Sequence, residues 1–185
     1  AKLQQGDQEN YKLWQEFISV SLKEFDRVYN RLDIHFDETL GESAYNDKLS
    51  GVVDGLIENQ IASESDGAIV IQYADDCKPK SLRKSTLVIR KKDGAFLYGT
   101  TDLATLEHRL ATWNPDRIIY VTDMRQQLHF QQVFHAWNVW RQKRGEPNVE
   151  RPDLVHTWFG MLKLPEGSMS TRKGNVIRLI DLLDE

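Results

Sequence analysis

The sequence predicts an α/β fold in which a doubly wound, parallel sheet is joined to a small subdomain with antiparallel strands. The first observation is an alternation of helical and strand patterns in the second half of the chain: helix 102–113, strand 117–121, helix 126–143 and strand 154–158. That order requires parallel strands with crossover helices. The second is Lys91-Lys92-Asp93-Gly94, which joins the β-rich runs 86–90 and 95–98 and indicates an antiparallel hairpin.

The first half of the chain opens with a long amphipathic helix, predicted for 11–32. Its apolar residues fall on one helical face: Trp14, Phe17, Ile18, Phe25, Val28 and Leu32. A short strand is predicted for 33–36, and a second helix for about 46–59 after a turn at Gly41. The turn signal Asp66-Gly67 then precedes a further β-rich run, 68–73.

These patterns divide the chain into three segments. Residues 1–44 form a helix–strand part of the doubly wound domain, 45–95 an inserted α/β subdomain, and 96–185 the remaining core of the doubly wound domain. The helix 126–143 has large apolar side chains on one face, which we interpret as core packing: Phe130, Val133, Phe134, Trp137 and Trp140.

Size and composition bound the class of protein. With 185 residues and 40% hydrophobic content, the chain is long enough for one ordinary core with a small subdomain. No apolar run approaches the roughly 18 residues of a membrane span. The single cysteine, Cys77, excludes an internal disulfide or a cysteine-rich metal site, and its simplest interpretation is a structural thiol. We therefore expect a soluble, cytoplasmic protein.

The net charge of −4 is unevenly distributed. Residues 1–76 hold 6 basic against 16 acidic side chains, and residues 77–185 hold 18 against 12. The run 78–92 has seven basic residues and no acid. It is either a solvated face, which is the more common case, or a surface that neutralises the phosphates of RNA.

Three polar loops follow predicted strands: 98–102, 122–130 and 160–161. In a doubly wound sheet, ligands bind beyond the carboxyl ends of the strands, where such loops lie. Tyr98 and Asp102 are four residues apart, so both side chains can face one side of a strand-to-helix turn. The alternative for Asp102 is an acid in the first turn of a helix that Thr101 caps. His129 could likewise be a core histidine.

Near the end of the chain, Met169-Ser170-Thr171-Arg172-Lys173-Gly174-Asn175 has the composition of a phosphate-gripping loop. Two adjacent cations, small residues and a permissive glycine suit the binding of a triphosphate. An ordinary basic turn is the alternative. The string MSTRKGN resembles the second signature of class I aminoacyl-tRNA synthetases, KMSKS.

Three longer blocks resemble, in order and spacing, the catalytic core of the arginyl-tRNA synthetases. They are FLYGTTDLATLEHRL, RIIYVTDMRQQLHFQQVF and HTWFGMLKLPEGSMSTRKGNVI, with AKLQQGDQENYKLWQEF and FDETLGESAYND upstream. The resemblance covers essentially the whole chain. It implies a Rossmann-type domain and an ATP-dependent ligase that converts L-arginine to arginyl-adenylate and transfers it to tRNA(Arg). It also implies Mg²⁺ accompanying ATP, no tightly bound protein metal and no membrane partner.

The resemblance also implies roles for individual residues. Asp102 would bind the arginine guanidinium, with Tyr98 and Gln126 as further arginine contacts. Asp123 and His129 would contact the ribose and adenosine of ATP, and Gly160 and Met161 the adenine. The loop would contribute ATP contacts from Met169, Ser170, Thr171 and Arg172, with Ser170, Arg172 and Lys173 acting in catalysis.

Two departures from the class I pattern qualify the expected activity. Thr171 stands where KMSKS has its second lysine, a common replacement in this family, so Arg172 or Lys173 would substitute. None of the five histidines belongs to a His-x-Gly-His pair, the first signature, and no anticodon-binding domain follows. We therefore expect an internal fragment that is inactive alone. The competing hypothesis is a non-catalytic RNA-binding module; a generic dinucleotide binder is excluded because no G-x-G-x-x-G follows a strand.

Overall fold

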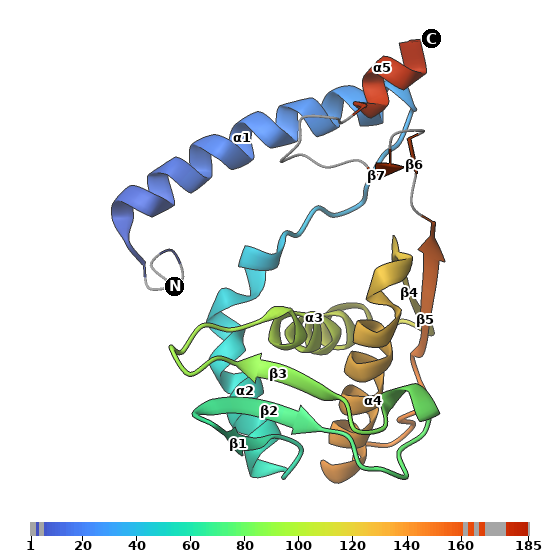
Figure 1. The fold of residues 1–185 in the computed structure, drawn as a ribbon. Coiled ribbons are helices and arrows are strands. Elements are labelled where there is room, and N and C mark those ends of the chain that lie inside the picture. The colour runs from blue at the N-terminus through green and yellow to red at the C-terminus, as the bar shows by residue number, and fades with distance from the viewer. Residues whose placement is uncertain (1–2, 4–5, 161–162, 165–166, 169–176, 185) are drawn as a thin grey trace. The chain divides into compact units, whose positions relative to one another are not determined.

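The computed structural model describes residues 3, 6–160, 163–164, 167–168 and 177–184 (Figure 1). The chain divides into two compact units, one of residues Gly41–Gly160 and the other of Ala1–Leu40 with Met161–Glu185. Each unit is described by itself below. No helix of the described residues is long and apolar enough to cross a membrane.

The first unit contains a long helix, α1 (Gln8–Arg31), as the apolar periodicity predicts. Asp7 caps its start by accepting a hydrogen bond from the Asn10 amide at 3.0 Å. The short strand predicted for 33–36 is wrong. The chain instead turns out of the helix with Asp33 at a φ of 54° and the Ile34 amide bonded to the Tyr29 carbonyl, so these backbone groups close the helix end.

Three short elements complete this unit: β6 (Lys163–Leu164) and β7 (Gly167–Ser168), which pair antiparallel, and α5 (Leu179–Asp184). Arg31 at the end of α1 donates to the Leu183 carbonyl at 3.2 Å, which ties α1 to α5.

In the second unit, the predicted helix 46–59 forms as a 3₁₀ segment, η2 (Glu42–Lys48), that runs into α2 (Leu49–Glu58). Four apolar residues of α2 are buried: Leu49, Val52, Val53 and Leu56. Gly55 is the point of closest approach, since a Cβ there would lie 2.7 Å from the indole ring of Trp140 on α4 (Gln127–Lys143). The small residue therefore permits the contact between the two helices.

A three-stranded antiparallel sheet follows, in the order β1 (Ser63–Ser65), β2 (Ala68–Gln72), β3 (Thr86–Arg90). The runs 68–73 and 86–90 are confirmed as strands, whereas the polar edge strand β1 was not expected. The predicted third run, 95–98, is wrong as a strand. Within it Phe96 makes one isolated antiparallel bridge to Arg90, and the chain then enters a helix.

That helix, α3 (Tyr98–Trp113), begins one turn earlier than the sequence predicts. Two contacts with β3 hold its first turn. The buried hydroxyl of Thr100 donates to the Ile89 carbonyl at 2.6 Å, and Gly99 lies so close to Leu87 that a Cβ would approach the leucine side chain to 3.1 Å. The early start of α3 is therefore a consequence of tertiary packing.

The predicted β-α-β unit is confirmed. β4 (Arg117–Asp123) leads through a 3₁₀ turn, η4 (Met124–Gln126), into α4 (Gln127–Lys143) and returns as β5 (Asp153–Phe159), parallel to β4 (Figure 1). The predicted apolar face of α4 packs inward, with Phe130, Val133, Trp137 and Trp140 buried and Phe134 partly buried.

One hydrophobic core unites this second unit. It includes Val53 and Ile71 from the segment predicted as an insertion, and Leu103 and Trp137 from the segment after it. The insertion boundaries at 45 and 95 stay a prediction. The observed packing shows that this segment shares its interior with α3 and α4.

Candidate active site

A cavity of about 710 Å³ lies in the second unit, beyond the carboxyl end of β4. This is where a doubly wound sheet places its ligands. Residues from the start of α3, the end of β4, η4, the start of α4 and η2 line it: Glu42, Tyr98, Thr101, Asp102, Tyr120, Thr122, Arg125, Gln126, His129 and Phe130. Four of the predicted site residues, Tyr98, Asp102, Gln126 and His129, are therefore together.

Asp102 is the fifth residue of α3, so it belongs to the second helical turn. The alternative of a first-turn acid capped by Thr101 is wrong, because the N-cap is Leu97 and Thr101 lies inside the helix. The carboxylate instead approaches the ring of His129, with 2.5 Å between Oδ2 and Nε2. Both side chains are about one quarter exposed, 25% for Asp102 and 24% for His129, so a ligand in the cavity can reach them.

Tyr98 and Gln126 flank this pair. Tyr98 opens α3 and its side chain is exposed, and the spacing of four residues puts it on the same helical face as Asp102. Gln126 ends η4, immediately before α4. The site is assembled from two helix starts, which the chain reaches after β3 and after β4.

A second histidine lies behind the first. The hydroxyl of Thr122 is 2.8 Å from Nε2 of His156 on β5, and the Phe130 ring packs against both imidazoles, with centroid distances of 5.3 Å to His129 and 4.7 Å to His156. Burial, and then the nearby His129, lower the pKa of His156. His156 is therefore neutral at pH 7 and adds no positive charge that would repel a cationic ligand.

Two other predicted residues are described but do not line the cavity. Asp123 caps η4 by accepting a hydrogen bond from the Arg125 backbone amide at 2.7 Å, and it accepts a second from Nε of the Arg125 side chain at 2.8 Å. The side-chain hydrogen bond, and then the backbone one, lower the pKa of the Asp123 carboxyl. Gly160 follows β5 and is exposed. Met161, Met169, Ser170, Thr171, Arg172 and Lys173 lie outside the described residues.

The cavity also contains residues that the sequence did not single out. Glu42 is the most informative, because it adds a second carboxylate from η2, 60 positions before Asp102. The packing of η2 on α3 brings it there: the Tyr45 and His108 rings meet edge-on at 5.5 Å, and Nζ of Lys48 lies 3.1 Å from Nδ1 of His108. No spacing rule links two such distant segments.

Tyr120 also faces the cavity from β4, and burial raises the pKa of its phenol well above its ordinary value. It is therefore neutral, and its hydroxyl can donate or accept a hydrogen bond. Among the described residues there is no cluster of three His, Cys, Asp or Glu side chains that could hold a metal. The cavity thus offers acidic, amide, phenol and imidazole groups to an organic ligand, together with one guanidinium, Arg125, whose charge is paired with Asp123.

The sequence of the whole chain, residues 1–185, matches the family model described as tRNA synthetases class I (R), catalytic domain. The chain belongs to this family. The arginine–tRNA ligases of Fusobacterium nucleatum subsp. nucleatum and Rhodopirellula baltica are 45% and 44% identical to it over its full length. The chain spans 30% and 26% of those two proteins.

Solved structures agree. The crystal structure of arginyl-tRNA synthetase from Plasmodium falciparum matches 99% of this chain with a TM-score of 0.73 and 32% identity, and the chain covers 28% of it. The arginyl-tRNA synthetase of Thermus thermophilus shares the fold at 16% identity, with a TM-score of 0.51 over 74% of the chain and 27% of that protein. The predicted α/β class and the family resemblance are confirmed.

Proposed function

We propose that the protein to which this chain belongs is an arginine–tRNA ligase. It activates L-arginine with ATP to give arginyl-adenylate and pyrophosphate, then transfers the arginyl group to the terminal ribose of tRNA(Arg). It works in the cytoplasm, Mg²⁺ accompanies ATP, and the protein holds no tightly bound metal of its own. The observation that carries this proposal is the convergence of Tyr98, Asp102 and Gln126 on one cavity.

The charge of the cavity suits arginine. A guanidinium is planar, always charged and carries five N–H donors in a fixed fork, so a carboxylate that accepts two parallel hydrogen bonds is its natural partner. Asp102 is that acceptor, and Glu42 is a second acid at the same cavity. Lysine presents a compact ammonium that cannot match this fork, and a neutral analogue forfeits the charge.

His129 positions the acceptor. Its bond to Oδ2 fixes the rotation of the Asp102 carboxylate before any ligand arrives, and a preorganised acceptor costs less conformational entropy on binding. Tyr98 and Gln126 then supply neutral hydrogen-bonding groups beside the guanidinium. These contacts hold arginine so that its own carboxylate attacks the α-phosphate of ATP, a step that depends on orientation and charge stabilisation.

The nucleotide contacts are proposed from the family resemblance. Asp123 and His129 contact the ribose and adenosine, and Gly160 and Met161 the adenine. Met169, Ser170, Thr171 and Arg172 bind the triphosphate, while Ser170, Arg172 and Lys173 stabilise the charge that builds on departing pyrophosphate. Preorganised donors of this kind act mainly in the transition state.

The test is amino-acid-dependent exchange of labelled pyrophosphate into ATP by the full-length protein, with and without tRNA(Arg). Arginine should support exchange and aminoacylation, while lysine and citrulline, the neutral isostere of arginine, should not. The isolated 185-residue chain, which has no His-x-Gly-His pair, should be inactive. Robust exchange with a different amino acid, or RNA binding without any exchange, would overturn the assignment.

A further inference from the structure

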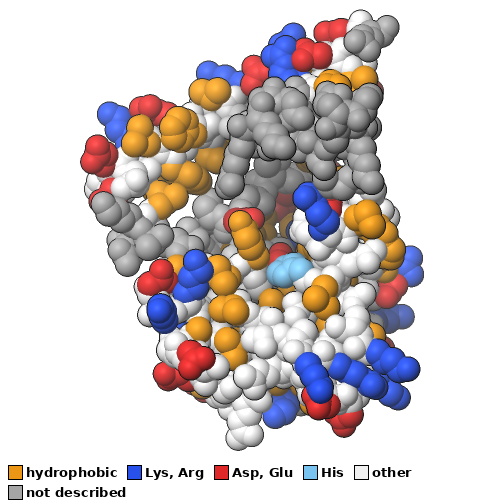
Figure 2. Space-filling view, viewed as in Figure 1, with side chains coloured by type: hydrophobic (Ala, Val, Ile, Leu, Met, Phe, Trp, Pro, Cys, Tyr) orange, Lys and Arg blue, Asp and Glu red, His pale blue; other side chains and the backbone are white. Residues whose placement is uncertain are grey.

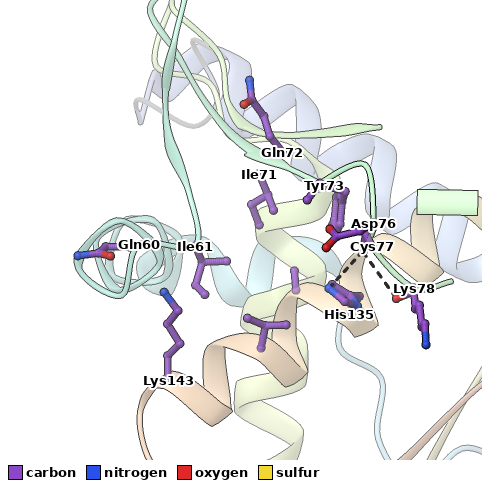
Figure 3. A pocket seen from close by; sticks show the side chains of 13 residues that line it. Gln60, Ile61, Ile71, Gln72, Tyr73, Asp76, Cys77, Lys78, His135 and Lys143 are labelled. Carbon is purple, nitrogen blue, oxygen red and sulfur yellow. Dashed lines mark hydrogen bonds between the residues drawn. The ribbon is translucent and has the colours of Figure 1, made fainter. Parts of the chain in front are cut away.

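A second cavity, of about 410 Å³, lies in the same unit and shares no residue with the first (Figure 3). It is an open hollow between the end of β2, the following loop and the middle of α4. Its apolar surface comes from Ile61, Ile71, Ala136 and Val139. A mostly apolar cleft with a few convergent polar groups is the usual form of a binding site for a small, flat organic group.

Two rings contribute to the wall. Tyr73 and His135 meet edge-on, with centroids 5.6 Å apart, and the Tyr73 hydroxyl donates to the Gln132 carbonyl at 2.7 Å, which fixes its ring. Burial lowers the pKa of His135, so its imidazole is neutral at pH 7. The Cys77 thiol lies beside it, 3.6 Å from Sγ to Nε2. Since Tyr73 is only 6% exposed, the partly buried His135 supplies most of the uncharged ring surface on which a heterocycle can stack.

The rim carries one edge-reading group. Asp76, in the loop after β2, supplies a carboxylate beside Tyr73 and Cys77, whereas the side chains of Gln60 and Gln72 point away from the space between Ile71, His135 and Lys143 (Figure 3). Proteins read the exposed edges of unpaired bases with polar side chains of this kind beside a stacking surface.

Cations surround this rim. The loop 75–84 carries Lys78, Lys80, Arg83 and Lys84 against Asp75 and Asp76, and Asp75 is paired with Lys84 at 3.6 Å. Arg83 donates to the Cys77 carbonyl at 3.0 Å. From the other side, Lys143 of α4 lines the cavity together with Lys78 (Figure 3).

The loop is also held against α4, because the Ser81 hydroxyl donates to the Gln131 side chain at 2.5 Å. Lys and Arg side chains gather on the η3 (Lys80–Leu82) side of the unit in the space-filling view (Figure 2). The cations of the loop therefore follow one edge of the cavity and Lys143 lies across from them, so that together they can meet the phosphates on either side of an inserted base.

We propose that this cavity receives one unpaired base of an RNA strand, with Lys78 and Lys143 contacting its flanking phosphates. The base stacks against the His135 ring beside the apolar wall, and the Asp76 carboxylate accepts a hydrogen bond from its edge. Under the proposed function that RNA is the tRNA substrate, so the inference rests on that proposal for the identity of the strand. It assigns the basic run a specific place of contact instead of a diffuse positive surface.

Cys77 provides a direct probe. In the full-length protein, the alkylation of Cys77 by iodoacetamide is followed by peptide mass spectrometry, with tRNA(Arg), a blunt RNA duplex or heparin present at saturation. We expect tRNA to slow alkylation at least about tenfold, and the duplex and heparin to leave it within about twofold. Equal protection by heparin would mean shielding by charge alone and would overturn the proposal, as would no protection by tRNA.

Variants test the same contact. Asp76→Ala removes the rim carboxylate, and Val139→Trp fills the cavity from α4; each should weaken tRNA binding by about tenfold, the scale of one lost base contact. Lys78→Ala and Lys143→Ala should each lower the slope of log affinity against log salt by about 0.7. Thermal unfolding checks that each variant is folded, and Asp76→Ala carries the test if Val139→Trp is not.

Lys92→Ala is the matched control. Lys92 belongs to the same basic run, but its Cβ lies beside Gly67, at the opposite end of β2 from the cavity. It should leave tRNA affinity within about twofold; an effect equal to that of Lys78→Ala would sink the proposal in favour of a diffuse charge effect. If wild-type protein aminoacylates tRNA but the cavity variants bind tRNA as tightly as wild type, only this inference fails. If wild-type protein shows no arginine-dependent activity, the proposed function fails.

Discussion

Nε2 of His129 lies 2.5 Å from Oδ2 of Asp102, although the two residues belong to different helices and are 27 positions apart in the sequence. Asp102 comes from the second turn of α3 and His129 from the first turn of α4. Their contact therefore links the two helix starts that form the cavity. The sequence supports an expectation that both residues bind substrates, but only packing of the two helices shows that they act on each other.

Asp102→Asn should weaken the use of arginine by about 1.5–3 kcal/mol, the value of a charge-assisted hydrogen bond, which is roughly 10- to 150-fold in kcat/KM. Folding should change little, because the side chain is partly exposed. Steady-state kinetics of the full-length protein at varied arginine measure the effect. Asp116→Asn, an exposed acid before β4, is the matched control. Unchanged kinetics in Asp102→Asn would remove this residue from the arginine site.

His129→Ala should raise the KM for arginine by a smaller factor, about fivefold, because it frees the carboxylate without removing it. If His129 acts by positioning Asp102, its loss should have much less effect in protein that already carries Asp102→Asn. A double-mutant cycle on kcat/KM should give a coupling of about 0.5–3 kcal/mol. Additive effects would show that His129 acts independently of Asp102, through the nucleotide for example.

The partly buried histidines, His135 and His156, should make stability depend on pH in one direction. Burial lowers the pKa of His135 in the folded state, so the unfolded chain binds more protons below about pH 6.5. The stability that depends on neutral His135 is therefore fully present above that pH. It is lost as the pH falls toward the folded-state pKa. His135→Asn should reduce the difference between the free energies of unfolding that urea titrations give at pH 7.5 and at pH 5.5. Some dependence should remain, since the pKa of His156 is lowered too; an unaltered slope contradicts the prediction.

Arg172→Ala should reduce turnover by roughly 10²–10³-fold in the full-length protein, if the side chain stabilises charge on departing pyrophosphate as one preorganised donor does. An interaction made equally with bound ATP would mainly raise the KM for ATP instead. Lys173→Ala should also impair turnover, and Asn175→Ala should do less, because an amide beside Gly174 shapes the turn. Normal turnover in both basic variants would make the loop an ordinary basic turn.

The sequence predicted the regular elements best where one periodicity was strong. The face of α4 from Phe130 to Trp140 and the strand β4 could be recognised because burial repeats at helical or strand spacing. The run 95–98 misled because Phe96, Leu97 and Tyr98 have a strand-like composition. The run does not form a strand because Thr100 and Gly99 contact β3 and start the helix early. Such tertiary contacts leave no periodic signal.

The site shows the same division. Tyr98 and Asp102 could be paired from a spacing of four, and Gln126 from its place after a strand. Glu42 could not be found in this way, because its approach depends on η2 packing against α3 through Tyr45. The strand predicted for 33–36 failed for a local reason: the backbone groups after α1 close the helix, as the hydrogen bond from the Ile34 amide to the Tyr29 carbonyl shows.

Gly99 offers the sharpest test of how the fold positions the proposed arginine site. A Cβ at Gly99 would lie 3.1 Å from the buried side chain of Leu87, so Gly99→Ala should displace the first turn of α3 by a few tenths of an ångström. Tyr98 and Asp102 move with that turn. Since a displacement of about 1 Å can cost 10²-fold, we expect kcat/KM for arginine to fall by about three- to tenfold.

Leu87→Val should relieve the crowding and restore part of the lost activity in the Gly99→Ala protein, although Leu87→Val alone should cost about 1 kcal/mol of stability. Gly55→Ala is the control for crowding away from the site. Its Cβ would press on Trp140, so it should lower the free energy of unfolding by about 1–3 kcal/mol and leave the KM for arginine unchanged in the folded protein. If Gly99→Ala lowers stability but leaves arginine kinetics intact, the contact between α3 and β3 supports the fold without setting the geometry of Asp102.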